Sequence, residues 1–171
     1  MLTKKMTAAL NGHLNLELYS AQLYLSMSSY AAFIGLKGAA TWFNVQYQEE
    51  MAHFMKFYGY INSRGEHVEL GPMKKVPSSF ASLLDMFGKT LVHEQMITRC
   101  INELTDLAIG EKDHATRIFL QWFVTEQIEE EENDREIIAK LKLIGDNGQG
   151  LLMLDNELGG RVFAPTPATA V

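Results

Sequence analysis

Four long segments of the chain place apolar residues at alternating steps of three and four, the period of an amphipathic α-helix. A glycine or a proline flanks each segment. Both residues are common just outside the ends of helices. The pattern predicts four long helices and one short one: 5–33, 38–63, from just after Pro77 (N-cap Ser78 or Ser79) to 109, 111–143, and 151–158. The sequence therefore indicates an all-α fold.

The lengths of the connections predict how the helices are arranged. Very short turns join the first helix to the second and the third to the fourth, so each pair forms an antiparallel hairpin. The link between the hairpins, 66–77, has 12 residues and can extend about 40 Å at ~3.3 Å per residue. A helix of about 28 residues has nearly the same length. We therefore expect a four-helix bundle with one long crossover, parallel second and third helices, and both hairpin turns at the same end.

Polar residues interrupt the apolar stripe of every long helix near its middle. The acids are Glu17, Glu50, Glu94 and Glu130, and His53 and Gln127 accompany them. All six lie 14 to 20 residues from a turn, so their heights along the bundle differ by at most about 9 Å. An unpaired carboxylate in a dry core costs several kcal/mol. Four of them at one level therefore need positive charge between them.

Two divalent cations would neutralise four carboxylates and use their oxygens as ligands. Glu50 and His53 stand three residues apart and face the same side of a helix, so they can serve one metal together. Oxygen-rich coordination with one imidazole suits iron or manganese, and zinc also fits. One isolated acid would more often be solvated. Six polar residues at matching height favour a metal site.

Composition narrows the classes of function. The net charge of −6 argues against nucleic-acid binding and suits attraction of cations. The single cysteine, Cys100, cannot form an internal disulfide. Polar residues interrupt the N-terminal segment where a signal peptide would be apolar, and no stretch suits a membrane span. We expect a cytoplasmic protein with one domain over 1–160 and a flexible tail over 161–171.

The polar motifs together resemble those of the bacterial non-haem ferritins over about residues 1–160. They are Glu17 with Tyr24, the run Glu49-Glu50-Met51-Ala52-His53, Glu94, and the run Glu126-Gln127-Ile128-Glu129-Glu130 shortly after Gln121-Trp122. The resemblance implies a ferritin-like bundle with a di-iron ferroxidase centre. It places the first iron on Glu17, Glu50 and His53, and the second on Glu94 and Glu130, bridged by Glu50, with Gln127 nearby.

The resemblance also implies further roles. Tyr24 would hydrogen-bond the centre and act in radical or electron transfer. A third iron site would use acids beside the first two sites: Glu49, Glu126, Glu129 and Glu130. The neighbouring Glu131 and Glu132 fit a solvated face better. The histidines at 13, 67, 93 and 114 are expected to be structural or on the surface.

The implied activity is oxidation of Fe(II) by dioxygen or hydrogen peroxide and storage of the ferric product as hydrated oxide. The implied assembly is a hollow shell of 24 subunits, in which the short helix 151–158 lines four-fold pores. That helix could instead cap the bundle. The positions where animal ferritins carry acids around a three-fold pore align with Arg117 and Leu120, so we expect no iron route there.

Other functions compete with this interpretation. Met51 follows Glu50 as the haem-ligating methionine does in bacterioferritin, but Gln127 and Glu130 stand where that family has a second Glu-x-x-His motif, so haem is disfavoured. A rubrerythrin-like peroxidase needs a Cys-x-x-Cys iron domain, which one cysteine excludes. A helical interaction protein or a passive metal-binding bundle would show no catalysed iron oxidation.

Overall fold

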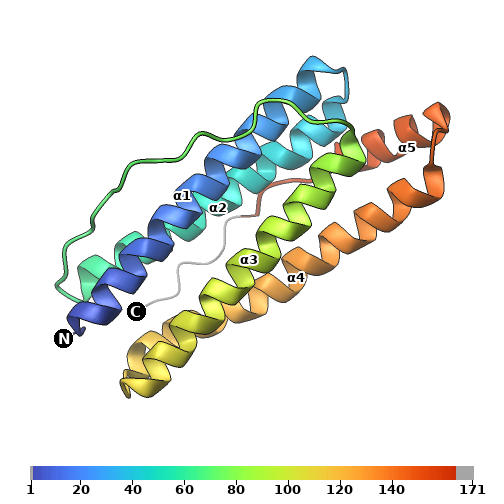
Figure 1. Ribbon diagram of the computed structural model, residues 1–171. Coiled ribbons are helices and arrows are strands. Elements are labelled where there is room, and N and C mark those ends of the chain that lie inside the picture. Colours follow the sequence, from blue (N-terminus) through green and yellow to red (C-terminus); the bar gives the residue numbers. More distant parts are fainter. Residues whose placement is uncertain (1, 165–171) are drawn as a thin grey trace.

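The computed structural model describes residues 2–164, which form helices and loops without a strand. The five helices are α1 (Lys4–Phe33), α2 (Lys37–Ser63), α3 (Leu83–Gly110), α4 (His114–Ile144) and α5 (Gly148–Leu158). Helices α1 to α4 make a long bundle, and a crossover loop runs along its side (Figure 1). The predicted all-α bundle with one long crossover and parallel α2 and α3 is confirmed.

The two hairpin turns lie at opposite ends of the bundle, and the expectation that they share an end is wrong (Figure 1). The crossover returns the chain to the end where α2 began, so α3 starts there and its turn into α4 falls at the far end. The four helices are 27 to 31 residues long. Because the polar residues lie near the middle of each helix, their shared level does not depend on which end carries the turn.

Side chains of α1 bind the crossover along much of its length. The amides of Asn11 and Asn15 exchange hydrogen bonds with backbone groups of 67–71, at distances of 2.7–3.1 Å. Farther along, Tyr30 donates its hydroxyl hydrogen to the carbonyl of Phe80 at 2.7 Å. These bonds satisfy backbone groups that an extended segment cannot satisfy within itself.

Three helix starts differ from the sequence prediction. Helix α3 begins three or four residues later than expected, since Ser82, and not Ser78 or Ser79, accepts the capping hydrogen bond from the Asp85 amide at 3.0 Å. The segment before it stays extended until Phe80, which is buried in the core. Asp113 caps α4. Asn147 caps α5, which starts three residues early.

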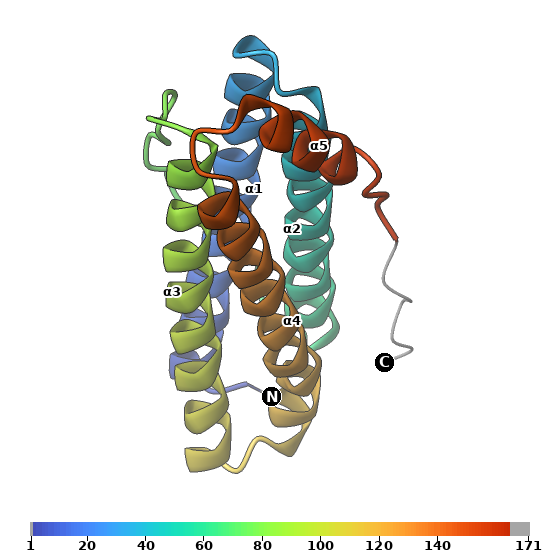
Figure 2. The same cartoon turned by 90° about the vertical axis from the view of Figure 1, so that its right-hand side faces the viewer.

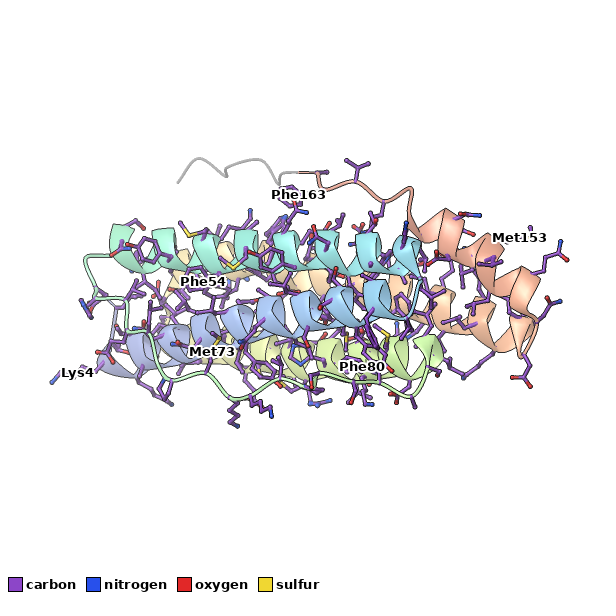
Figure 3. All side chains as sticks on the ribbon, turned by 90° about the horizontal axis from the view of Figure 1, so that it is seen from above. Lys4, Phe54, Met73, Phe80, Met153 and Phe163 are labelled. Carbon is purple, nitrogen blue, oxygen red and sulfur yellow. The ribbon has the colours of Figure 1, made fainter. Side chains whose placement is uncertain are left out.

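The interior consists of two apolar clusters that lie on either side of the polar level. One contains Tyr24, Phe43 and Phe87 near the α5 end. The other contains Met6, Phe57 and Phe123 toward the opposite end. Side chains fill the space between the helices along the whole bundle (Figure 3). Both clusters exclude water from the polar level between them, which raises the electrostatic cost of unpaired charges there.

One residue of the apolar stripe predicted for the third helix is not buried. Steps of three and four along the third helix predict that Leu84 faces the core, but its side chain is 38% exposed and its neighbour Leu83 is buried instead. Leu120 is fully buried, as the apolar stripe of the fourth helix predicts. Of the two positions that align with pore acids of animal ferritins, only Arg117 is exposed.

Helix α5 lies across one end of the bundle, beside the start of α2 and the end of α4 (Figure 2). Leu154 and Leu158 join the apolar core, whereas Met153 is 68% exposed and points away from the bundle (Figure 3). The helix therefore caps the bundle and keeps an outward apolar face. None of the described helices is long and apolar enough to cross a bilayer. Most of the expected flexible tail, 165–171, lies outside the described residues.

Candidate metal centre

A layer of polar side chains crosses the bundle between the two apolar clusters, and α1 to α4 all contribute to it. Each member is at most 5% exposed: Glu17, Gln46, Glu50, His53, Glu94, Gln127 and Glu130. All six residues that the stripe pattern selected are therefore buried at this level. Since ionised groups are rarely buried without partners, the layer requires compensation by protons, by hydrogen bonds or by cations.

One half of the layer is a convergent group of three side chains from α1 and α2. Oxygen or nitrogen atoms of Glu17, Glu50 and His53 all lie within 4.8 Å of one another. His53 Nδ1 is 3.8 Å from Glu17 Oε2 and 3.6 Å from Glu50 Oε2. Glu17 Oε2 is buried and has no hydrogen-bond partner. This unsatisfied carboxylate oxygen faces two further possible metal ligands, Glu50 and His53. The arrangement therefore suits a cation bound between the three side chains.

The protonation states of this group also suit a cation. Burial lowers the pKa of His53, so its imidazole is neutral and offers a lone pair. Burial, followed by the charges of Glu94 and Glu17, raises the pKa of Glu50 well above its usual value. Burial also opposes ionisation of Glu17, but His13 and His53 outweigh it and lower that pKa to about 2. In the metal-free protein, Glu17 and Glu50 therefore share one proton, which resides on Glu50. A bound dication would displace this proton.

The other half of the layer has side chains from all four long helices, α1 to α4. Tyr24 donates its hydroxyl hydrogen to Glu94 Oε1, and Gln127 Nε2 lies 3.1 Å from Glu94 Oε2. Gln46 Nε2 donates to Glu130 Oε2 at 2.8 Å. Burial and the charge of Glu130 raise the pKa of Glu94 to about 8. Hydrogen-bond donors thus fix the orientation of the carboxyl groups of Glu94 and Glu130. At neutral pH the carboxyl group of Glu94 is protonated.

The acids expected to form a third site border the layer on its α2–α4 side. Glu49 and Glu126 are half-buried, whereas Glu129 is exposed. Burial is the largest cause that raises the pKa of Glu49 and of Glu126 to about 7. Glu126 Oε1 is 4.0 Å from His53 Nε2, so this group lies directly beside the first. Of the two neighbouring acids, Glu132 is exposed, and Glu131 is half-buried and accepts from Thr98 Oγ1 at 2.7 Å.

Besides Gln46, three residues at or beside the layer are not among those that the sequence predicts for the site. His13 is 3% exposed and its Nε2 lies 2.7 Å from Glu17 Oε1. Asp134 is 1% exposed, its Oδ2 has no hydrogen-bond partner, and burial with nearby Glu94 raises its pKa to about 9. His13 and Asp134 each lie on an apolar stripe, four residues from Glu17 and Glu130 respectively. This spacing could have indicated from the sequence that they border the site. Arg161 also reaches the layer, and no periodicity predicts its position.

Comparison with known proteins gives consistent matches. A family model described as a ferritin-like domain matches residues 7–144. The bacterial non-haem ferritin of Campylobacter jejuni is 45% identical over 158 residues, covering 92% of this chain and 95% of the relative. That of Staphylococcus aureus is 39% identical over 163 residues, covering 95% and 98%. The crystal structure of an open pore ferritin from the archaeon Archaeoglobus fulgidus superposes with a TM-score of 0.94 at 46% identity, covering 95% of this chain and 100% of that chain.

Proposed function

Since the chain belongs to the ferritin family, we propose that its buried polar layer is a ferroxidase centre that binds two Fe(II) ions and lets dioxygen oxidise them. The chain is a subunit of an iron-storage ferritin. The observation that carries the proposal is the burial of four carboxylates, one imidazole and two amides at one level between two apolar clusters. Iron is the substrate that makes this arrangement electrostatically favourable.

The first Fe(II) is held by Glu17, Glu50 and His53. Glu17 is ionised and His53 neutral before iron arrives, so two of the three ligands need no proton transfer. Glu50 loses its proton as the cation binds, because a nearby dication lowers the pKa of a carboxyl group. His13 donates to Glu17 and fixes the orientation of that carboxylate, as partners of metal ligands generally do.

The second Fe(II) is held by Glu94 and Glu130, with Glu50 between the two positions and Gln127 beside them. Tyr24 hydrogen-bonds Glu94, which puts its phenol next to the site of electron transfer. Each Fe(II) loses one electron, and dioxygen or hydrogen peroxide accepts both. Hard anionic ligands favour the ferric product. The protein's own contribution is the fixed spacing of ligands in a site from which apolar side chains exclude water.

A third iron position is proposed on Glu49, Glu126, Glu129 and Glu130. It is supported by two half-buried acids on the side of the layer shared by α2 and α4. Glu126 lies 4.0 Å from His53, and the charge of Glu130 helps to raise the pKa of both Glu49 and Glu126. Iron leaving the two oxidation sites would meet this acidic group next. The product is then stored as hydrated ferric oxide in a shell of 24 copies, in the cytoplasm. The outward apolar face of α5, which includes Leu152 and Met153, suits contacts between copies.

Two other functions make different predictions. A haem-binding subunit would use Met51, which is half-buried and packs against apolar core residues. Methionine in such a setting usually serves packing, and a Soret band in the purified protein would identify haem. A passive metal-binding bundle would bind Fe(II) without accelerating its oxidation.

The test combines anaerobic Fe(II) titration with stopped-flow oxidation on the assembled protein. We expect two tight sites per subunit and oxidation far faster than in buffer. Glu17→Gln and Glu94→Gln should each remove one tight site and slow the first turnover by about 100-fold or more, since each removes an anionic ligand. Glu132→Gln, an exposed acid on α4, is the matched control and should behave as wild type. Oxidation unaffected by Glu17→Gln and Glu94→Gln would refute the centre.

A further inference from the structure

The segment that follows α5 places one cation beside the iron centre. Arg161 stands three residues after the end of α5 and lies against three residues on one face of α2. Its Nη2 is 2.5 Å from Glu49 Oε2, its Nη1 donates to Gln46 Oε1 at 2.7 Å, and its guanidinium carbon lies 4.4 Å from the centre of the Trp42 ring. Two charge-assisted hydrogen bonds and a stacked ring fix this guanidinium closely.

The contact with Gln46 extends into the polar layer. A guanidinium only donates hydrogen bonds, so Gln46 must present its oxygen to Arg161. Its amide nitrogen is then directed the other way, where it donates to Glu130 Oε2 at 2.8 Å. Arg161 therefore determines the orientation of the fully buried Gln46 amide, and through it one oxygen of a proposed iron ligand.

Helix α5 holds Arg161 in place by docking tightly on the start of α2. The carboxylate of Asp155 accepts from the backbone amides of Gly38 and Ala39 at 3.0 and 2.8 Å. Exposed amides at a helix N-terminus bind carboxylates well. A Cβ atom on Gly38 would lie 1.5 Å from the carbonyl oxygen of Asp155, so the close approach requires glycine. Arg161 thus depends on a helix that lies across the end of the bundle.

We infer that Arg161 is a positioning residue that occupies the third iron site as a tethered cation and holds Gln46 against Glu130. The inference rests on the proposed third site. Glu49 is at once the ion-pair partner of Arg161 and a proposed ligand, so iron at that position must displace the guanidinium or share the carboxylate with it. Iron would consequently bind the third position weakly and move on from it, and undocking of α5 would strengthen its binding there.

The test is anaerobic calorimetric titration of Fe(II) into the full-length, assembled, metal-free protein. The wild type should show two tight sites and one weak site per subunit. Arg161→Gln should tighten the weak site about tenfold, a typical coupling between neighbouring charged groups, and leave the number of tight sites unchanged. Arg161→Lys keeps the charge but not the planar pair of donors, and should give an intermediate affinity. Arg135→Gln removes an arginine paired with Glu131 on the surface of α4 and should change nothing.

Glu49→Gln separates the inference from the proposed function. If Glu49→Gln removes the weak site but Arg161→Gln does not tighten it, the third site stands and the role of Arg161 is refuted. If a weak site appears neither in the wild type nor in Arg161→Gln, the third site and the inference both fail. If Arg135→Gln tightens the site as much as Arg161→Gln, the effect is one of general charge, and the positioning role is refuted. Circular dichroism and native mass verify that each variant folds and assembles.

Discussion

His13 Nε2 lies 2.7 Å from Glu17 Oε1, one turn away on α1, and both side chains are buried. Because the ionised carboxylate can only accept, the imidazole donates this hydrogen bond. It is a main reason why the pKa of Glu17 falls to about 2 despite burial. His13, which is not an iron ligand in our assignment, thus keeps the proposed ligand Glu17 ionised.

Replacing His13 with alanine should destabilise the metal-free protein by about 1–3 kcal/mol, because a buried carboxylate loses its donor. Glu17 has a folded pKa below its usual 4.5. Its contribution to stability is therefore present above pH 4.5 and is lost as the pH falls toward 2. Denaturant unfolding at pH 7 and pH 3 measures this. His13→Gln, which keeps a donor, should lose less, and exposed His67→Ala should lose nothing. An equal loss for alanine at both pH values would contradict the mechanism.

The metal-free protein should become less stable as the pH rises from 5 to 9. Burial raises the pKa of Glu94 to about 8 and that of Asp134 to about 9. Each group therefore stabilises the fold fully below its unfolded pKa, near 4, and loses that contribution as the pH passes its folded pKa. Thermal unfolding of chelator-treated protein should show a falling melting temperature. Added Fe(II) under anaerobic conditions should flatten the curve, since the cations replace the protons.

Asp134→Asn isolates one part of that dependence. The amide has nearly the same shape but cannot ionise. The variant should therefore resemble wild type below about pH 4, where Asp134 is protonated in both the folded and the unfolded protein, and should become more stable than wild type as the pH rises to 9. Equal melting temperatures for the two proteins at both pH 4 and pH 9 would show that the core does not raise the pKa of Asp134.

His53→Ala should weaken Fe(II) binding at the first position by at least about tenfold and slow the first oxidation correspondingly, because it removes the only imidazole ligand. The second position should be less affected. Anaerobic titration and stopped-flow absorbance measure the two effects. His114→Ala, an exposed histidine at the start of α4, is the control. Wild-type kinetics in His53→Ala would exclude His53 as a ligand.

Gly38→Ala should destabilise the protein by about 2–4 kcal/mol or release α5, because the new Cβ would overlap the carbonyl oxygen of Asp155. Gly59, on the same helix, would have nothing within 4 Å of an added Cβ. Gly59→Ala should therefore stabilise by about 0.5–1 kcal/mol through its higher helix propensity. Denaturant unfolding compares the two. Similar effects at both positions would contradict the requirement for close packing at α5.

The sequence was sufficient to predict the helices and the buried polar layer, because burial imposes a regular period on each helix. Glu17, Glu50 and Glu130 were found on stripes that are otherwise apolar, and the structure buries all three. The assignment of individual ligands to iron positions stays a prediction. The prediction for the third helix is less accurate, because its buried face includes Met86 beside Leu83 and Phe87 and is therefore wider than a single stripe.

Features that depend on tertiary contacts could not be predicted in this way. The start of α3 is decided by the hydrogen bond from Tyr30 to the crossover and by the burial of Phe80, neither of which has a local signature. Arg161 follows two glycines in a segment that has no period, so only the docking of α5 shows that it reaches Glu49. His13 was on the correct stripe but was assigned no role beyond the core.

The opposite placement of the two hairpin turns gives the bundle an approximate internal two-fold axis, perpendicular to the helices, that exchanges α1 with α3 and α2 with α4. The spacing agrees, since 33 residues separate Glu17 from Glu50 and 33 separate Glu94 from Gln127. Each hairpin then supplies one half-site, and His53 of the first corresponds to Glu130 of the second. The two iron positions therefore differ at two pairs of symmetry-related residues. Glu50 of the first hairpin corresponds to Gln127 of the second, and His53 corresponds to Glu130, while the helices around them are duplicated.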